Sequence, residues 1–135
     1  MAGDRPSALL HTRIERRDAV AVVVAQGELD VSSSSRLVDE VVGLQAEDGP
    51  EAVVVDMTGV GFMDSSGLRA LLDCERSCRE AGRAFALARP TEAVRRVLEL
   101  VDLLEALTVL DDVTPQALAG LGAGGDADTA GRAAG

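Results

Sequence analysis

The chain has 135 residues, enough for one domain with a sizeable core and too few for two domains of ordinary size. Apolar residues make up 47% of it, and its only aromatic residues are Phe62 and Phe85. Acidic side chains outnumber basic ones by 23 to 13, which gives a formal net charge of −10. This charge, with so few rings for base stacking, argues against nucleic acid or an anionic membrane as the partner. It allows a protein partner with a basic surface.

The sequence shows no sign of a membrane segment or of a cofactor site. No apolar run approaches the length of a membrane span, and the N-terminus lacks the apolar core of a signal peptide, so we expect a cytoplasmic protein. Cys74 and Cys78 are four residues apart, and we expect both to be buried apolar side chains on one face of a helix. A metal site would need further ligands, and none cluster nearby, so we predict neither metal nor cofactor.

The first half of the chain predicts a strand hairpin followed by a helix. Residues 9–16 and 19–26 have strand character, and the two-residue link between them predicts an antiparallel pair. The segment Gly27-Glu28-Leu29-Asp30 ends the second strand. Its aspartate and the serines at 32–35 are candidate N-caps for a helix to about residue 47. The apolar residues of that helix recur at helical spacing: Leu37, Val38, Val41, Val42 and Leu44.

The middle of the chain predicts a buried strand followed by a second helix. Residues 53–55 are three consecutive valines, which suits a central strand covered on both faces. The threonine and two glycines within residues 58–61 are expected to end this strand. Apolar residues at helical spacing then predict a helix over 66–81, with Gly82 just beyond its C-terminus.

Three good N-cap residues in a row, Asp64, Ser65 and Ser66, precede this second helix. Two adjacent hydroxyls would then lie where free backbone N–H groups and the helix dipole can receive an anion. From the local sequence alone, Ser65 is either a plain N-cap or a modified residue, whereas we expect Ser66 to be the cap. Gly67 would allow a tight, close-packed start to the helix.

The rest of the chain continues the alternation of strands and helices. Residues 83–88 predict a strand, and Thr91 is the expected N-cap of a third helix. A short strand follows at 107–110, and a last helix at 113–121, with Pro115 in its first turn. The predicted order of elements is therefore β-β-α-β-α-β-α-β-α.

This order predicts an α/β domain over residues 1–118. The strand–helix–strand connections are long enough for crossovers, which require parallel pairing. We therefore expect a mixed, mostly parallel sheet of four to five strands with helices packed on it. Gly, Ala and isolated Asp dominate residues 119–135, which are predicted to form a disordered tail.

Most catalytic chemistries lack the residues that they need. The only histidine, His11, is far in sequence from Ser65, so a Ser-His-Asp site is not expected, although a small hydrolase built on Ser65 or Ser66 stays an alternative. The sequence has no GxxxxGK or GxGxxG loop and no lysine. The carboxylates of Asp30, Asp56 and Asp64 could form a metal pocket like that of a phospho-aspartate receiver. That pocket usually needs a lysine as well.

Two segments resemble a known family. Phe62-Met63-Asp64-Ser65-Ser66-Gly67-Leu68, after a valine-rich strand that ends in Asp56-Met57, looks like the signature of bacterial anti-sigma factor antagonists of the STAS fold. Gly27-Glu28-Leu29-Asp30 is similar to the family's other recurrent segment. The resemblance covers roughly residues 9–118, with the same order of elements throughout.

The resemblance implies a protein without catalytic activity of its own. Its unphosphorylated form would bind an anti-sigma factor, often itself a serine kinase, and so release a sigma factor. The kinase would phosphorylate Ser65, and a phosphatase would reverse this. The partner-binding surface would include four residues around that serine: Asp30, Asp64, Ser66 and Gly67. Arg69 departs from the family, in which small residues are common at this position.

A phosphate at Ser65 would act through its charge. It adds about −1.5 to −2 charges at neutral pH, beside Asp64 and, if the strand ends converge, near Asp30. A loss of about 3–4 kcal/mol in binding would lower affinity a few hundredfold. The alternative within the family is a STAS subunit without sigma control, such as a component of a lipid transporter or a signalling scaffold.

Overall fold

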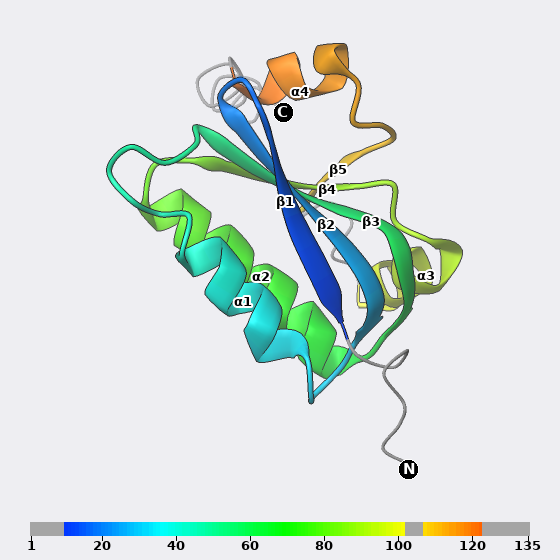
Figure 1. Cartoon of the computed structure of the whole chain (residues 1–135). Helices are drawn as coiled ribbons and strands as arrows, with labels where there is room; N and C mark the ends of the chain where they lie inside the picture. Colours follow the sequence, from blue (N-terminus) through cyan, green and yellow to red (C-terminus); the bar gives the residue numbers. More distant parts are fainter. Residues whose placement is uncertain (1–9, 102–106, 123–135) are drawn as a thin grey trace.

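The computed structural model describes residues 10–101 and 107–122, and Figure 1 shows one twisted sheet flanked by helices. The elements in chain order are β1 (His11–Arg17), β2 (Val20–Leu29), α1 (Ser34–Val42), β3 (Ala52–Met63), α2 (Ser65–Glu80), β4 (Ala84–Ala88), α3 (Glu92–Leu100), β5 (Thr108–Leu110) and α4 (Pro115–Gly122). The predicted order is therefore confirmed. The strands form one sheet in the order β1-β2-β3-β4-β5, with β1 antiparallel to β2 and the other neighbours parallel.

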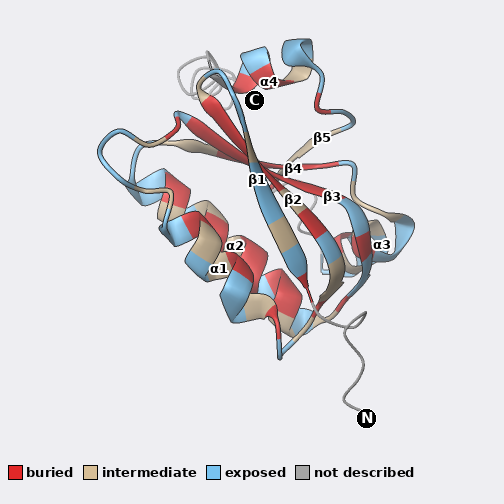
Figure 2. Ribbon diagram, viewed as in Figure 1, coloured by how far each residue is buried: buried red, intermediate tan, exposed pale blue. Residues whose placement is uncertain are grey.

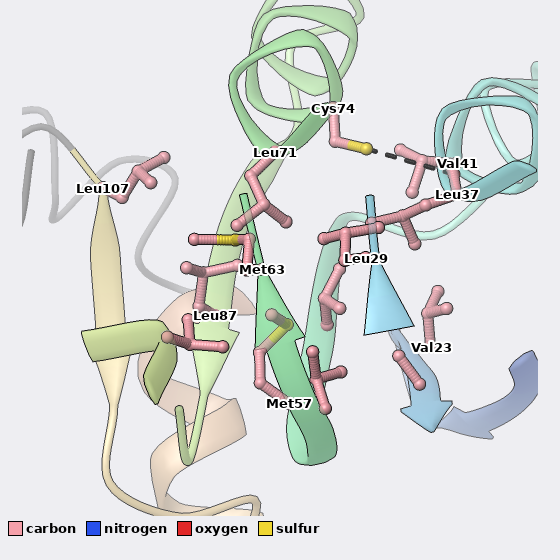
Figure 3. Close-up of a cluster of buried hydrophobic side chains, with 14 of the residues drawn as sticks. Val23, Leu29, Leu37, Val41, Met57, Met63, Leu71, Cys74, Leu87 and Leu107 are labelled. Atoms are coloured by element: carbon pink, nitrogen blue, oxygen red, sulfur yellow. Dashed lines mark hydrogen bonds between the residues drawn. The ribbon is translucent and has the colours of Figure 1, made fainter. Parts of the chain in front are cut away.

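The two faces of this sheet are covered differently. Helices α1, α2 and α3 pack on one face and enclose the larger of two buried apolar clusters. Figure 2 shows β3 and β4 largely buried, whereas β1 is exposed or half-buried. Figure 3 shows Leu29 and Met63, from the ends of β2 and β3, in this cluster with Leu37 of α1 and Leu71 of α2. Helix α4 covers part of the other face with Leu118 and Leu121. The valine run of β3 is therefore buried on both sides, as predicted.

The prediction that β3 ends at residues 58–61 is wrong. The strand continues to Met63, because its backbone keeps pairing with β2 through two irregularities in register. Gly59 and Gly61 lie within the strand, and a strand can contain glycine where it bulges. This continuation carries β3 to the edge of the sheet at which β2 also ends.

Two helix ends also differ from the prediction. Helix α1 ends at Val42, with Gly43 as its C-cap, instead of reaching residue 47. Helix α4 extends to Gly122, and its Leu121 is buried, so the predicted tail of 119–135 overlaps this helix. Residues 123–135 lie outside the described residues, so the disorder of the tail and the domain boundary stay predictions. The N-cap of α3 is Thr91, as predicted, because its hydroxyl accepts a hydrogen bond from Val94 N at 3.4 Å.

Candidate functional site

The ends of β2 and β3 bring Asp30 and Asp64 together. Leu29 pairs with Met63 in the parallel register, and the N–H of Asp64 donates to the carbonyl oxygen of Leu29 at 3.3 Å. Each aspartate directly follows one member of this pair. The condition set from the sequence, that the two strand ends converge, is therefore met by the backbone.

Asp64 is the N-cap of α2. Its Oδ1 accepts hydrogen bonds from the N–H groups of Ser66 at 2.9 Å and Gly67 at 3.1 Å. The expectation that Ser66 is the cap is wrong, because Asp64 comes first and its carboxylate reaches both amides. The sequence had suggested that the N–H groups at this helix start are free to receive an anion. The amides of Ser66 and Gly67 are not free, because the Asp64 carboxylate already accepts hydrogen bonds from both and neutralises this end of the helix.

Ser65 is the first residue of α2, and it is exposed. Among the described residues, no hydrogen bond engages its hydroxyl, because Asp64 performs the capping. A hydroxyl held at a rigid helix start, exposed and without an internal partner, is accessible to another protein. Ser65 is therefore not the N-cap of α2, and its side chain is available at the surface.

Gly67 fixes how closely α2 approaches β2. A Cβ on this residue would overlap the carbonyl oxygen of Leu29 and would lie 2.7 Å from Cγ of Met63. The predicted close-packed helix start is therefore confirmed. Gly67 is buried, so its direct contact with a partner stays a prediction, whereas Ser66 is partly exposed.

Asp30 forms a tight turn with the serines that follow it. Its Oδ1 accepts hydrogen bonds from the hydroxyl of Ser32 at 2.8 Å, from the N–H of Ser32 at 3.0 Å and from the hydroxyl of Ser33 at 3.2 Å. The bond from the Ser32 hydroxyl contributes most to lowering the pKa of Asp30 below its usual value. Asp30 therefore stays negatively charged at the edge of the sheet where β3 also ends, directly before Asp64.

Two exposed apolar residues flank these polar groups, and sequence reasoning did not select them. Val31, next to Asp30, is 78% exposed, and Phe62, next to Met63, is 46% exposed. A hollow of about 450 Å³ opens beside Phe62 and is lined also by Met63 and by Glu92, Ala93, Arg96 and Val97. The only signal in the sequence was an aromatic residue between Gly61 and the capping aspartate. Exposed apolar side chains around a polar centre are typical of a protein-binding surface.

Asp56 does not belong to this site. It is buried on the face of β3 away from α2, and its carboxylate accepts hydrogen bonds from the Thr58 hydroxyl at 2.6 Å and from Arg89 at 2.8 Å. Burial acts to raise its pKa, but the hydrogen bonds from Arg89 and Thr58 outweigh it, so the pKa is lowered. Among the residues described, no group of three His, Cys, Asp or Glu side chains could hold a metal. The acidic-pocket alternative therefore finds no support.

Other sequence candidates lie elsewhere or have other partners. Arg69, one turn after Ser65 on α2, is exposed and lies 3.7 Å from a carboxylate oxygen of Asp73. Cys74 and Cys78 are buried, as predicted, and burial raises the pKa of both thiols. His11 is exposed at the start of β1 and pairs with Gln26. Within the described ranges, no helix is both long and apolar enough to cross a membrane.

Comparison with known proteins gives the family. The chain is similar to the anti-sigma-F factor antagonists RsfA and RsfB of Mycobacterium tuberculosis. It is 27% identical to RsfA over 104 residues, which are 76% of this chain and 81% of that protein. It is 30% identical to RsfB over 86 residues, which are 64% of this chain and 69% of that protein.

The fold is also similar to a solved structure. The crystal structure of an anti-sigma factor antagonist from Mycobacterium paratuberculosis superposes with a TM-score of 0.71 at 27% identity, covering 83% of this chain and 93% of that one. The model of the STAS domain family matches residues 11–114. The chain therefore belongs to the STAS domain family.

Proposed function

We propose that this protein is an anti-sigma factor antagonist whose binding is switched by phosphorylation of Ser65. The observation that carries the proposal is the exposed Ser65 hydroxyl, without an internal hydrogen bond in the described part of the chain, beside Asp64 at the start of α2. The names of the relatives support the class of partner. The unphosphorylated form would bind an anti-sigma factor and release a sigma factor.

The proposed mechanism is electrostatic and needs no catalysis by this chain. The Asp64 carboxylate already holds the amides of Ser66 and Gly67, so a phosphate at Ser65 would compete with it for the helix N-terminus. The added charge of about −1.5 to −2 would therefore project toward the partner. A serine kinase, in the simplest case the anti-sigma factor itself, would add the phosphate, and a phosphatase would remove it. The partner surface would include Asp30, Val31 and Phe62.

The test is the affinity for the cognate anti-sigma factor, measured by calorimetry. Ser65→Ala should bind like the unmodified protein and resist the switch, whereas Ser65→Asp should bind about a hundredfold or more weakly. Ser77→Asp is the matched control, because it adds the same charge near the other end of α2 and should bind normally. Full affinity of Ser65→Asp would contradict the switch.

A second experiment separates this function from the alternative of a STAS subunit without sigma control. The protein would be incubated with a candidate anti-sigma kinase and ATP and its intact mass measured, with Ser65→Ala as the control. A gain of one phosphate in the unmodified protein alone supports the switch. No gain with any anti-sigma kinase of the host favours the transporter or scaffold role. A serine-reactive probe should not label Ser65, because no hydrogen bond from a described residue engages its hydroxyl.

A further inference from the structure

Strand β1 forms one edge of the sheet. It pairs with β2 on one side, and no described strand pairs with its other side. Its seven residues are exposed or half-buried, and none is buried. An open edge presents unpaired backbone N–H and C=O groups, which can accept a further strand.

The side chains of β1 alternate between the two faces. Arg13, Glu15 and Arg17 lie opposite Val24, Val22 and Val20, on the face that carries α4. They form a positive–negative–positive row, in which Glu15 lies 2.7 Å from Arg13 and 2.8 Å from Arg17. Ile14 lies opposite Val23 at the margin of the larger core and is 40% exposed.

Symmetry restricts how this edge can pair with itself. Two copies of β1 that pair antiparallel are related by a two-fold axis perpendicular to the sheet. Residues opposite each other then point to the same face, so the axis passes midway between the two copies of one residue. An axis at Arg13 sets two arginines against each other. An axis at Glu15 sets two glutamates against each other and Arg13 against Arg17. Both registers are repulsive.

The register centred on Ile14 is different. It uses all seven residues of β1 and sets Arg13 of each copy against Glu15 of the other. The two exposed Ile14 side chains then meet on the axis, beside the larger core. The remaining pairs are Thr12 with Arg16 and His11 with Arg17. The register that uses the whole strand therefore also sets opposite charges against each other on both sides of the axis.

We infer that β1 pairs with β1 of a second copy of this chain, centred on Ile14, so that two sheets join into one. Charges on an edge strand usually discourage pairing, but this row is complementary to itself when it is reversed. Because the strands run antiparallel across the axis, the two Ser65 sites would lie at opposite ends of the joined sheet. The inference therefore does not depend on the proposed function and does not block its site.

The experiment is sedimentation equilibrium of the full chain and of charge-swapped variants. Arg13→Glu sets the introduced glutamate against Glu15 of the other copy, and Glu15→Arg sets the introduced arginine against Arg13. Each variant should therefore dissociate at least about tenfold more readily. Arg16→Glu is the matched control, because Arg16 faces Thr12 in this register and the dimer should persist. Circular dichroism would establish that each variant is folded.

Mixing the two single variants gives the decisive measurement. Each alone should be mainly monomeric, but in the mixture the glutamate introduced in one variant faces the arginine introduced in the other, so a heterodimer should form. Loss of the contacts within one strand could not produce this rescue. The inference is wrong if the unmodified protein stays monomeric at the highest soluble concentration. It is equally wrong if the single swaps leave the dimer unchanged, or if the mixture does not associate.

Discussion

Asp56 and Asp64 belong to the same stretch of chain, yet their surroundings give them opposite roles. Asp56 is 5% exposed and is bound by a guanidinium and a hydroxyl. Asp64 is partly exposed and binds only backbone amides among the described residues. A buried carboxylate bound to side chains ties strands together. A carboxylate bound to the main chain leaves the hydroxyl of its neighbour, Ser65, without a hydrogen bond in the described part of the chain.

The surroundings of Asp56 are more constrained than those of Asp64. Arg89, directly after β4, bonds to Asp56 on β3 and donates its backbone N–H to Leu110 of β5 at 2.9 Å. It adopts a φ of 50°, a conformation uncommon for residues with a side chain. One residue thus connects three strands.

The largest expected effect is that of Gly67→Ala, which tests the packing beneath Asp64. Its Cβ would overlap a backbone oxygen, which cannot move aside like a flexible side chain. We expect a loss of about 3 kcal/mol in the free energy of unfolding, measured with urea. Gly61→Ala is the control, since no described atom lies within 4 Å of its Cβ position, and it should change stability by less than about 0.5 kcal/mol. Equal effects would remove the close-packing argument.

The next effect is that of Asp56→Asn. It removes the buried charge and leaves Arg89, which is 40% exposed, with Asp112 and water. We expect a loss of about 2 kcal/mol, less than for a fully buried pair. Asp73→Asn removes a surface carboxylate that pairs with Arg69 and Arg76, and should cost about 0.5 kcal/mol or less. The urea midpoints of the two variants would coincide if burial did not matter.

The stability that Asp56 provides should depend on pH. Its pKa in the folded protein is lowered, so the folded state binds this proton less readily than the unfolded chain, whose Asp pKa is about 3.9. The contribution is therefore complete above about pH 5 and declines as pH falls through the lower, folded pKa. Unfolding of the unmodified protein and of Asp56→Asn between about pH 7 and pH 3 should show their difference shrinking on the acid side. A difference that grows there would reverse the assigned sign.

A smaller effect is expected for Asp64, which separates capping from charge. Asp64→Ala leaves the Ser66 and Gly67 amides unpaired and should cost about 1 kcal/mol. Asp64→Asn keeps an oxygen in place and should cost only about 0.3 kcal/mol. Thermal unfolding of both variants provides the comparison. If Asn were as damaging as Ala, the charge and not the cap would matter.

The smallest effect concerns Arg69 and applies to phosphorylated protein. A side chain four residues after Ser65 leans back over the first turn of the helix, so Arg69 should pair with a phosphate there. Arg69→Ala should destabilise the phosphorylated form by about 0.5 kcal/mol more than the unmodified form. Arg76→Ala, which also removes a partner of Asp73, should affect both forms alike. Thermal unfolding of the two forms, each with and without the substitution, decides the matter.

Much of this architecture could be predicted, because apolar spacing reports burial directly. The hairpin, the crossovers, the start of α3 at Thr91 and the burial of Cys74 and Cys78 follow from local patterns. The continuation of β3 could not be predicted, because pairing with β2 across its glycines is a tertiary contact. The correct cap also could not be ranked from sequence, since Asp64, Ser65 and Ser66 all have the right chemistry.

The Asp56–Arg89 pair and the exposure of Val31 were out of reach for a similar reason. Each depends on which segments distant in sequence meet, or fail to meet, in space. A valine beside Asp30 looks like core in sequence and proves to be 78% exposed.

The carbonyl group of Leu29 has a mechanical consequence. One oxygen atom receives the N–H of Asp64 and also limits how near Gly67 can come. The loop holding Val31 begins directly after this residue. A protein that binds this loop and displaces it would also move the Leu29 peptide unit, and with it the start of α2. Binding at this loop would thus be coupled to the position of the Ser65 hydroxyl through the main chain at Leu29.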